Sequence, residues 1–62
     1  MKLRIEITCD NAAFADFPEV ECGRILQEFV RSHRFVGLFD DDGTEPLLDL
    51  NGNRVGIAEF ND

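Results

Sequence analysis

The sequence is poor in the residues that metal sites and catalytic sites require. It contains two cysteines and one histidine, whereas a structural zinc site takes about four such ligands. Its one serine, Ser32, directly precedes the histidine, His33, so the two side chains point to different faces of a helix. A nucleophile with its base and orienting acid cannot be assembled from this set. We therefore expect no enzyme, no metal site and no cofactor.

Long hydrophobic runs are also missing. No apolar run approaches the ~20 residues of a membrane helix. Residues 1–7 alternate apolar and charged side chains, where a signal peptide has a continuous apolar stretch. These absences predict a cytoplasmic protein with reduced thiols. Cys9 and Cys22 both fall on expected core faces, where free cysteines pack as small hydrophobic side chains.

Basic residues are scarce relative to acidic ones. The chain has 6 Lys and Arg against 13 Asp and Glu, which gives a formal net charge of −7. Nucleic acids and anionic membranes repel a chain of this charge. The expected partner is therefore a protein with a basic surface, and we expect no direct contact with nucleic acid or membrane.

The acidic residues concentrate in the second half of the chain. Residues 1–31 carry 4 basic and 6 acidic side chains, a net of −2, and residues 32–62 carry 2 basic and 7 acidic, a net of −5. Averaged over the surface this charge is far more dilute than that of DNA, so only a cluster can compete locally for a basic groove. The expected cluster consists of Asp40, Asp41, Asp42 and Glu45, with Glu59 and Asp62 added in space.

The same aspartates do not form a calcium loop. The EF-hand pattern needs acidic ligands at loop positions 1, 3 and 5 before a glycine at position 6. With Gly43 at the glycine position, Leu38 occupies the first ligand position, and the pattern fails. The segment is therefore a solvated turn or a functional acidic patch.

Hydrophobic periodicity predicts an α+β fold in a single domain, residues 1–62. The expected order is β-α-β-β-β, with a single helix packed on one face of a four-stranded sheet. Residues 34–40 are apolar on both faces, which favours a central strand. The expected elements are a strand at 2–9, a helix from about Pro18 to Ser32, and strands at 34–40, 47–50 and 53–60.

The dipeptide Asn51-Gly52 predicts a two-residue type I′ hairpin turn. Such a turn sets Leu48 opposite Val55, and Asp49 opposite Arg54 as an ion pair on the uncovered face. The residues expected on the helix-covered face are Leu48, Leu50, Val55 and Ile57.

The uncovered face of this sheet would still receive apolar side chains, including Leu47 and Phe60. We expect this face to be covered by residues 10–17, by a second copy of the chain or by another protein, because a wet apolar face is unfavourable.

Three segments, KLRIEIT, ECGRILQEF and DLNGNRVGIAEF, resemble small acidic proteins encoded by phages and prophages. That set includes the anti-CRISPR proteins, which block bacterial CRISPR–Cas surveillance complexes or nucleases. The resemblance implies an inhibitor without catalytic chemistry that acts in the bacterial host cell by occupying a protein surface. Many such inhibitors cover the basic site that would hold target DNA.

Two functional hypotheses follow from these observations. The first is a stoichiometric inhibitor of a nucleic-acid-binding protein, most concretely an anti-CRISPR that occupies a basic surface of a CRISPR–Cas complex. The alternative is a small self-associating accessory or structural protein of phage or bacterial origin, present as a homodimer. The expected partner-binding residues are Asp40, Asp41, Asp42, Glu45, Glu59 and Asp62, with a secondary surface at Glu21, Glu28, Leu47 and Phe60.

Overall fold

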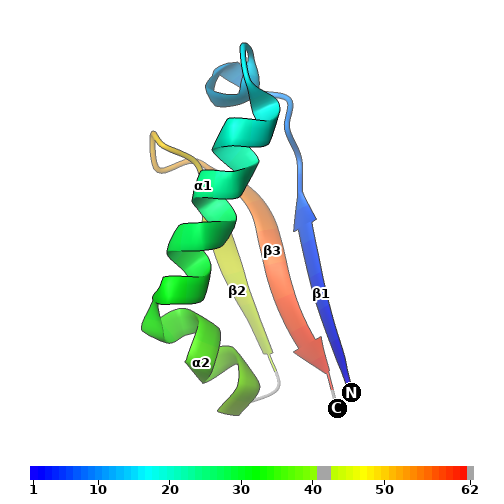
Figure 1. Ribbon diagram of the computed structural model, residues 1–62. Coiled ribbons are helices and arrows are strands. Elements are labelled where there is room, and N and C mark those ends of the chain that lie inside the picture. Colours follow the sequence, from blue (N-terminus) through cyan, green and yellow to red (C-terminus); the bar gives the residue numbers. More distant parts are fainter. Residues whose placement is uncertain (41–42, 62) are drawn as a thin grey trace.

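The computed structural model describes residues 1–40 and 43–61. These residues form three strands, two α-helices and one turn of 3-10 helix (Figure 1). Asp41, Asp42 and Asp62, which belong to the predicted acidic cluster, lie outside the described residues. In chain order the elements are β1 (Lys2–Ile7), η1 (Ala12–Phe14), α1 (Pro18–Arg31), α2 (His33–Asp40), β2 (Gly43–Leu48) and β3 (Arg54–Asn61).

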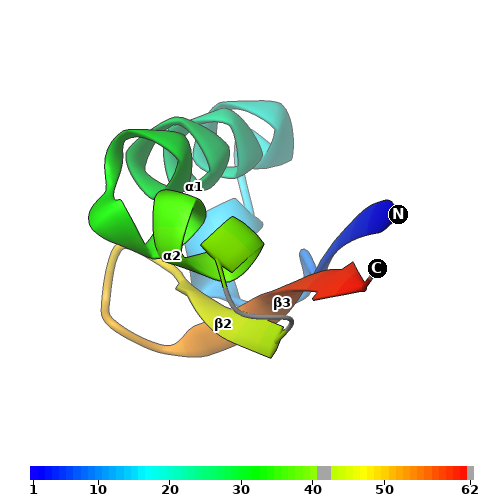
Figure 2. The ribbon, with the colours of Figure 1, turned by 90° about the horizontal axis from the view of Figure 1, so that it is seen from below.

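The three strands form one antiparallel sheet in the order β1-β3-β2. The central strand is therefore β3, and β1 and β2 are the two edges. Both helices lie on the same side of the sheet (Figure 2). The prediction of a single helix on a four-stranded sheet is wrong, because residues 34–40 are helical and the described residues contain only these three strands.

Helix α1 begins where the sequence predicts it. Pro18 occupies the first turn, where the missing N–H costs nothing. Glu19 and Glu21 in the first turn and Arg31 in the last turn complement the helix dipole. None of the described helices has the length and apolar character needed to cross a membrane.

Residues 34–40 form most of helix α2 and not the predicted central strand. Apolar side chains in this segment fit one flank of a short helix as well as both faces of a strand. Ser32 separates the two helices, because its backbone is extended (ψ 159°). Its hydroxyl donates to the carbonyl of Phe29 at 2.7 Å, and its own carbonyl accepts from the N–H of Phe35 at 3.3 Å. This serine therefore ends α1 and starts α2.

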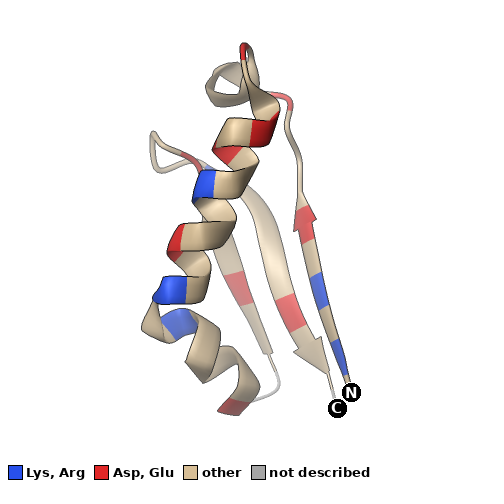
Figure 3. Ribbon diagram, viewed as in Figure 1, with Lys and Arg blue, Asp and Glu red and all other residues tan. Residues whose placement is uncertain are grey.

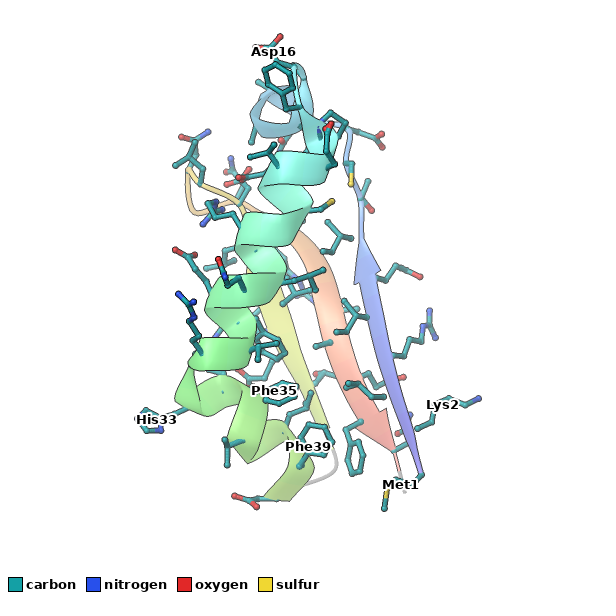
Figure 4. All side chains as sticks on the ribbon, in the orientation of Figure 1. Met1, Lys2, Asp16, His33, Phe35 and Phe39 are labelled. Atoms are coloured by element: carbon teal, nitrogen blue, oxygen red, sulfur yellow. The ribbon has the colours of Figure 1, made fainter. Side chains whose placement is uncertain are left out.

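Aromatic rings connect the two helices to the sheet. Phe35 and Phe39 point from α2 toward the sheet, whereas His33 points into solvent (Figure 4). The ring centroids of Phe29 and Phe35 lie 5.7 Å apart, those of Phe35 and Phe39 5.1 Å, and those of Phe39 and Phe60 4.6 Å. Edge-on and tilted contacts of this kind each add to the gain from burial. These rings position α2 over the end of β3.

The hairpin between β2 and β3 is longer than the predicted two-residue turn. Leu48 pairs with Arg54, and a bulge leaves Val55 as an extra residue of β3. Residues 49–53 form the loop, which is closed by the N–H of Asp49 donating to the carbonyl of Asn53 at 2.8 Å. Gly52 is the only described residue with a positive φ, of 83°. A type I′ turn needs positive φ at two residues, so it does not form.

Val55 is buried as predicted, but beyond it the bulged register exchanges the two faces of the hairpin. Leu47, Ala58 and Phe60 are buried beneath the helices, although the sequence predicted Leu47 and Phe60 on the uncovered face. Leu48 and Leu50, which were predicted in the core, are 43% and 69% exposed. The far face of the sheet is consequently mostly polar and requires no cover. The buried core consists of Phe14, Ile25, Phe29, Leu38, Leu47, Val55, Ala58 and Phe60.

Candidate functional site

The members of the predicted acidic cluster that the structure describes do not lie together. Asp40 is exposed at the end of α2. Glu45 pairs with Ala58 and so lies on the helix-covered face, where its carboxylate is 3.8 Å from Arg34. Glu59 is the neighbour of Ala58 in the same strand and therefore points to the other face. The described acidic residues of this region are spread over two sides of the sheet.

The two glutamates of the predicted secondary surface have different environments. Glu28 is exposed and accepts a hydrogen bond from Arg24 Nη1 at 2.6 Å. Glu21 is buried, although it was predicted to belong to a partner-binding surface. Its Oε1 accepts from Arg24 Nε at 2.7 Å, and its Oε2 accepts from the N–H of Leu50 at 2.9 Å. Glu21 therefore ties α1 to the β2–β3 loop, and only Glu28 is available to a partner.

Asp49 is the second buried carboxylate, and its role also differs from the prediction. The predicted ion pair with Arg54 does not form between these described residues. Asp49 Oδ1 accepts from the N–H groups of Asn51 and Asn53, both at 2.8 Å, and Oδ2 accepts from Asn11 Nδ2 at 2.7 Å. The clue in the sequence is the density of asparagines around an Asx turn.

Hydrogen bonding lowers the pKa of both buried carboxyl groups. The bonds from Arg24 lower the pKa of Glu21 and outweigh the opposing effect of burial. For Asp49 burial acts to raise the pKa, but the combined bonds from Asn53, Asn11 and Asn51 prevail and lower it. Both groups are therefore structural carboxylates that hold the β2–β3 loop, and neither resembles a raised-pKa general acid.

The free edge of β1 is the most unusual backbone feature. Hydrogen bonds of an antiparallel strand alternate between its two sides. The N–H of Thr8 donates to the carbonyl of Val55 at 2.7 Å, which continues the β1–β3 ladder. The even-numbered residues of β1 therefore bond to β3, and the N–H and C=O groups of Leu3, Ile5 and Ile7 point to the open edge. Among the described residues the one partner on that side is the Cys9 thiol, whose Sγ lies 3.8 Å from the carbonyl oxygen of Ile7.

An apolar stripe of β1 stays partly exposed on the helix-covered face of the sheet. Leu3 and Ile5 pair with the buried residues Phe60 and Ala58, so they share the helix-covered face, yet they remain 40% and 38% exposed. On α1, Val30 is 51% exposed. The alternation of residues 2–9 predicted this apolar stripe correctly, but the structure leaves it incompletely covered.

The two cysteines lie close together beyond the end of β1. Cys9 follows β1 and is exposed, which contradicts its predicted core position, and Cys22 is half-buried on α1. Their Sγ atoms lie 3.2 Å apart. The hydrogen bond with Cys9 and partial burial raise the pKa of the Cys22 thiol. The thiol pair links the end of β1 to the helix layer.

The described residues contain no group of three or more His, Cys, Asp or Glu side chains that could hold a metal ion. The surface hollows formed by the described residues include one of about 460 Å³ and one of about 400 Å³. The first is lined by Thr8, Asp10, Asn11 and residues 54–57, and the second lies between Arg24, Arg34 and the β2–β3 loop. Neither contains a cysteine, histidine or serine that would act as a nucleophile or as its base.

The chain matches no protein-family model, no curated protein and no solved structure. The features that bear on function are therefore the charges, the free edge of β1 and the exposed apolar side chains of that strand.

Proposed function

We propose that this protein is a non-catalytic, stoichiometric inhibitor that occupies the basic surface of a nucleic-acid-binding protein. The most concrete form of the proposal is an anti-CRISPR that acts on a CRISPR–Cas complex in a bacterial host cell. The observation that supports this proposal is a set of exposed carboxylates that form no ion pair with any described lysine or arginine.

Ion pairs among the described residues engage Arg4, Arg24 and Arg34, which are half of the basic residues. Arg4 is 3.1 Å from Glu6, Arg24 pairs with Glu21 and Glu28, and Arg34 lies 3.8 Å from Glu45. These pairs use the glutamates along the sides of the molecule. The carboxylates that remain exposed and unpaired among the described residues are Asp10, Asp16, Glu19 and Asp40.

The unpaired carboxylates lie toward the two ends of an elongated molecule. Asp10, Asp16 and Glu19 surround η1 and the start of α1, and Asp40 ends α2 at the opposite end (Figure 3). The principal extents of the chain are 36 × 18 × 17 Å. An acidic end of this width fits a groove shaped for nucleic acid, and complementary charge accelerates association with such a site.

Two matched variants test which end binds the partner. Asp40, Asp41 and Asp42 are replaced with asparagine in one, and Asp10→Asn, Asp16→Asn and Glu19→Gln are combined in the other. Each variant loses three negative charges, so their net charges are identical. The association rate with a purified, guide-loaded CRISPR–Cas surveillance complex is measured at several ionic strengths.

We expect the Asp40–Asp42 variant to associate about tenfold more slowly than wild type and with a weaker salt dependence. The other variant is the control for net charge. If both triple variants keep the wild-type rate and salt slope, the acidic ends are not the binding surface. If wild type added in equimolar amount leaves target-DNA binding by the complex unchanged, the inhibitory role itself is wrong.

A second candidate is a small accessory or structural protein that self-associates. The unpaired edge of β1 favours it, because a bare strand edge is a template for another strand. Sedimentation of the purified chain across a concentration series measures its oligomeric state. The result distinguishes a self-associating protein from an inhibitor that acts as a monomer.

A further inference from the structure

The open edge of β1 presents a regular set of backbone groups. The three residues Leu3, Ile5 and Ile7 each direct an N–H and a C=O away from the sheet. The strand contains no proline, and its ladder with β3 runs from Lys2 to Ile7 without a bulge. From these features and the charges beside them, we propose that two copies of the chain pair antiparallel through β1, with Ile5 opposite Ile5 of the second copy.

Hydrogen bonding restricts the registers that such a dimer can adopt. Bonded pairs across the new interface must join outward-facing residues, which are Leu3, Ile5 and Ile7. With Ile5 on the twofold axis, Leu3 of each copy faces Ile7 of the other. All three outward-facing residues are then used in both copies. The weak thiol contact to the carbonyl of Ile7 is readily displaced by a backbone N–H.

Charge selects this register over its neighbours. Centred on Ile5, the pairing places Arg4 opposite Glu6 of the second copy, twice by symmetry. A register centred on Arg4 sets two arginines against each other, and one centred on Glu6 sets two glutamates against each other. Opposite charges on directly facing residues stabilise an antiparallel pair, and like charges destabilise it. Arg4 and Glu6 already lie 3.1 Å apart within one copy, so the dimer would hold an alternating group of four charges.

The same register also covers the exposed apolar side chains of β1. A twofold axis perpendicular to the sheet places the helices of both copies on one face of a six-stranded sheet. Leu3, Ile5 and Ile7 of the two strands then meet in the valley between the two α1 helices. Burial of Leu3 and Ile5, which are 40% and 38% exposed in one copy, adds an apolar contribution to the backbone pairing.

The other sheet edge is unsuited to this role. Pro46 lies in the middle of β2 and has no N–H, and its carbonyl accepts a hydrogen bond from Arg34 Nη1 at 2.6 Å. A strand that approached β2 could therefore not pair with Pro46, because its N–H is absent and its carbonyl is already hydrogen-bonded. Each copy therefore has one edge available for pairing, and assembly stops at two copies.

Charge reversal provides a test that is specific to the register. Arg4→Glu sets a glutamate against Glu6 of the second copy, and Glu6→Arg sets an arginine against Arg4 of the second copy. We expect the dimer of each variant to be about tenfold weaker than that of wild type, or weaker still, in sedimentation velocity experiments. An equimolar mixture of the two variants restores complementary pairs and should form the heterodimer. The double variant R4E/E6R should form a homodimer of wild-type strength.

Asp16→Arg is the control, since it changes the net charge as much as Glu6→Arg does but lies far from β1. Amide hydrogen exchange gives a second readout. The N–H groups of Leu3, Ile5 and Ile7 should become protected as protein concentration rises, while the exchange of residues 49–53 stays constant.

Three outcomes would overturn the proposed pairing. The first is a chain that stays monomeric to millimolar concentration, and the second is a dimer that neither charge reversal weakens. The third is a double variant weaker than both single variants, which indicates a different register. The pairing does not depend on the inhibitory role. If the chain is a monomer and still blocks the CRISPR–Cas complex, the proposed dimer is wrong and the proposed inhibitory role is retained.

Discussion

The two edges of the sheet differ in how they meet solvent. The β2 edge carries Pro46 at its centre, Arg34 on the proline carbonyl and a bulge beside Leu48. The β1 edge has an unbroken ladder to β3 and exposes its outward backbone groups. Natural sheets commonly protect their edges with prolines, charges and bulges.

The β2 edge therefore carries a proline and a bulge that the β1 edge lacks, and of these protective features β1 carries only charged side chains. Both edges are short strands of six residues, so length does not explain the difference. The helices also favour the β2 side, since both α1 and α2 contact β2. The β1 edge is therefore the side of the molecule on which strand addition is physically easiest.

The largest expected effect follows from replacing Gly56 with alanine. Gly56 pairs with Ile7, and a Cβ there would collide with the carbonyl oxygen of Glu6 and lie 3.0 Å from the Cα of Ile7. We expect the free energy of unfolding to fall by about 2–4 kcal/mol. The melting temperature, measured by circular dichroism, should drop by about 10–20 °C.

Gly37→Ala is the matched control for this substitution. Gly37 lies inside α2, and an added Cβ meets no atom within 4 Å. Alanine there should raise the stability by about 0.5–1 kcal/mol. If Gly56→Ala melts at the wild-type temperature, then β1 contributes little to the fold and the edge is not rigidly held.

Oxidation of Cys9 and Cys22 would fix the end of β1 to α1. Their Sγ atoms are 3.2 Å apart. With oxidised glutathione, the Cys9 thiolate attacks one sulfur and releases a glutathione thiolate. The Cys22 thiolate then attacks Cys9 Sγ and releases the second glutathione. The cross-link, which closes a loop of roughly 15 residues, should stabilise the fold by up to about 3 kcal/mol.

The raised pKa of the Cys22 thiol makes this closure slow at neutral pH and faster as the pH rises. Intact mass should fall by two hydrogen atoms, and Cys9→Ser should prevent the change. A wild-type chain that gives only mixed disulfides with glutathione would show that the two thiols do not meet in solution.

Removal of the proline tests whether the β2 edge is actively protected. Pro46→Val restores an outward N–H on β2, and stability should change by less than about 1 kcal/mol because the site is at an edge. A chain with two bare edges can add strands at both, so light scattering should detect species larger than a dimer. Thr44→Val, on the same strand with Pro46 retained, is the control. Equal scattering from both variants would contradict a protective role for the proline.

The smallest effect concerns pH. Glu21 and Asp49 have lowered pKa values in the folded state, so their stabilisation is present above the unfolded pKa of about 4 and is lost as the pH falls through the folded value. We expect residues 49–53 to open in acid before the β1–β3 ladder does, as followed by amide hydrogen exchange. Asp49→Asn should lower the melting temperature at pH 7 and flatten its dependence on pH. Simultaneous loss of loop and ladder would refute the proposed order.

Local patterns were sufficient to predict some elements and not others. The predicted strand at 2–9 and the predicted helix from about Pro18 to Ser32 appear in the structure as β1 and α1. Residues 34–40 were assigned to the wrong type, because a short segment rich in phenylalanine fits a buried strand or a helix flank equally well. The decisive contact, between Ser32 and Phe29, is visible only in three dimensions.

The hairpin error had larger consequences for the predicted site. One bulged residue, Val55, changes which side chains of β2 face the helices. Leu47 and Phe60 were predicted on a docking surface and lie in the core. Asp49 was predicted in a surface ion pair and lies in a buried hydrogen-bond network. The signal for that network was the set of asparagines around Asp49, whose side chains cap backbone N–H groups at a turn.

The position of β3 at the centre of the sheet has a consequence for synthesis. This strand is the last of the three along the chain, and both β1 and β2 pair with it and not with each other. While the ribosome makes the chain, β1 therefore waits without a partner until residues 56–61 have emerged. The helices and their local contacts can form earlier, since they need no distant segment. During that interval the strand that later forms the bare edge is unpaired along both of its sides.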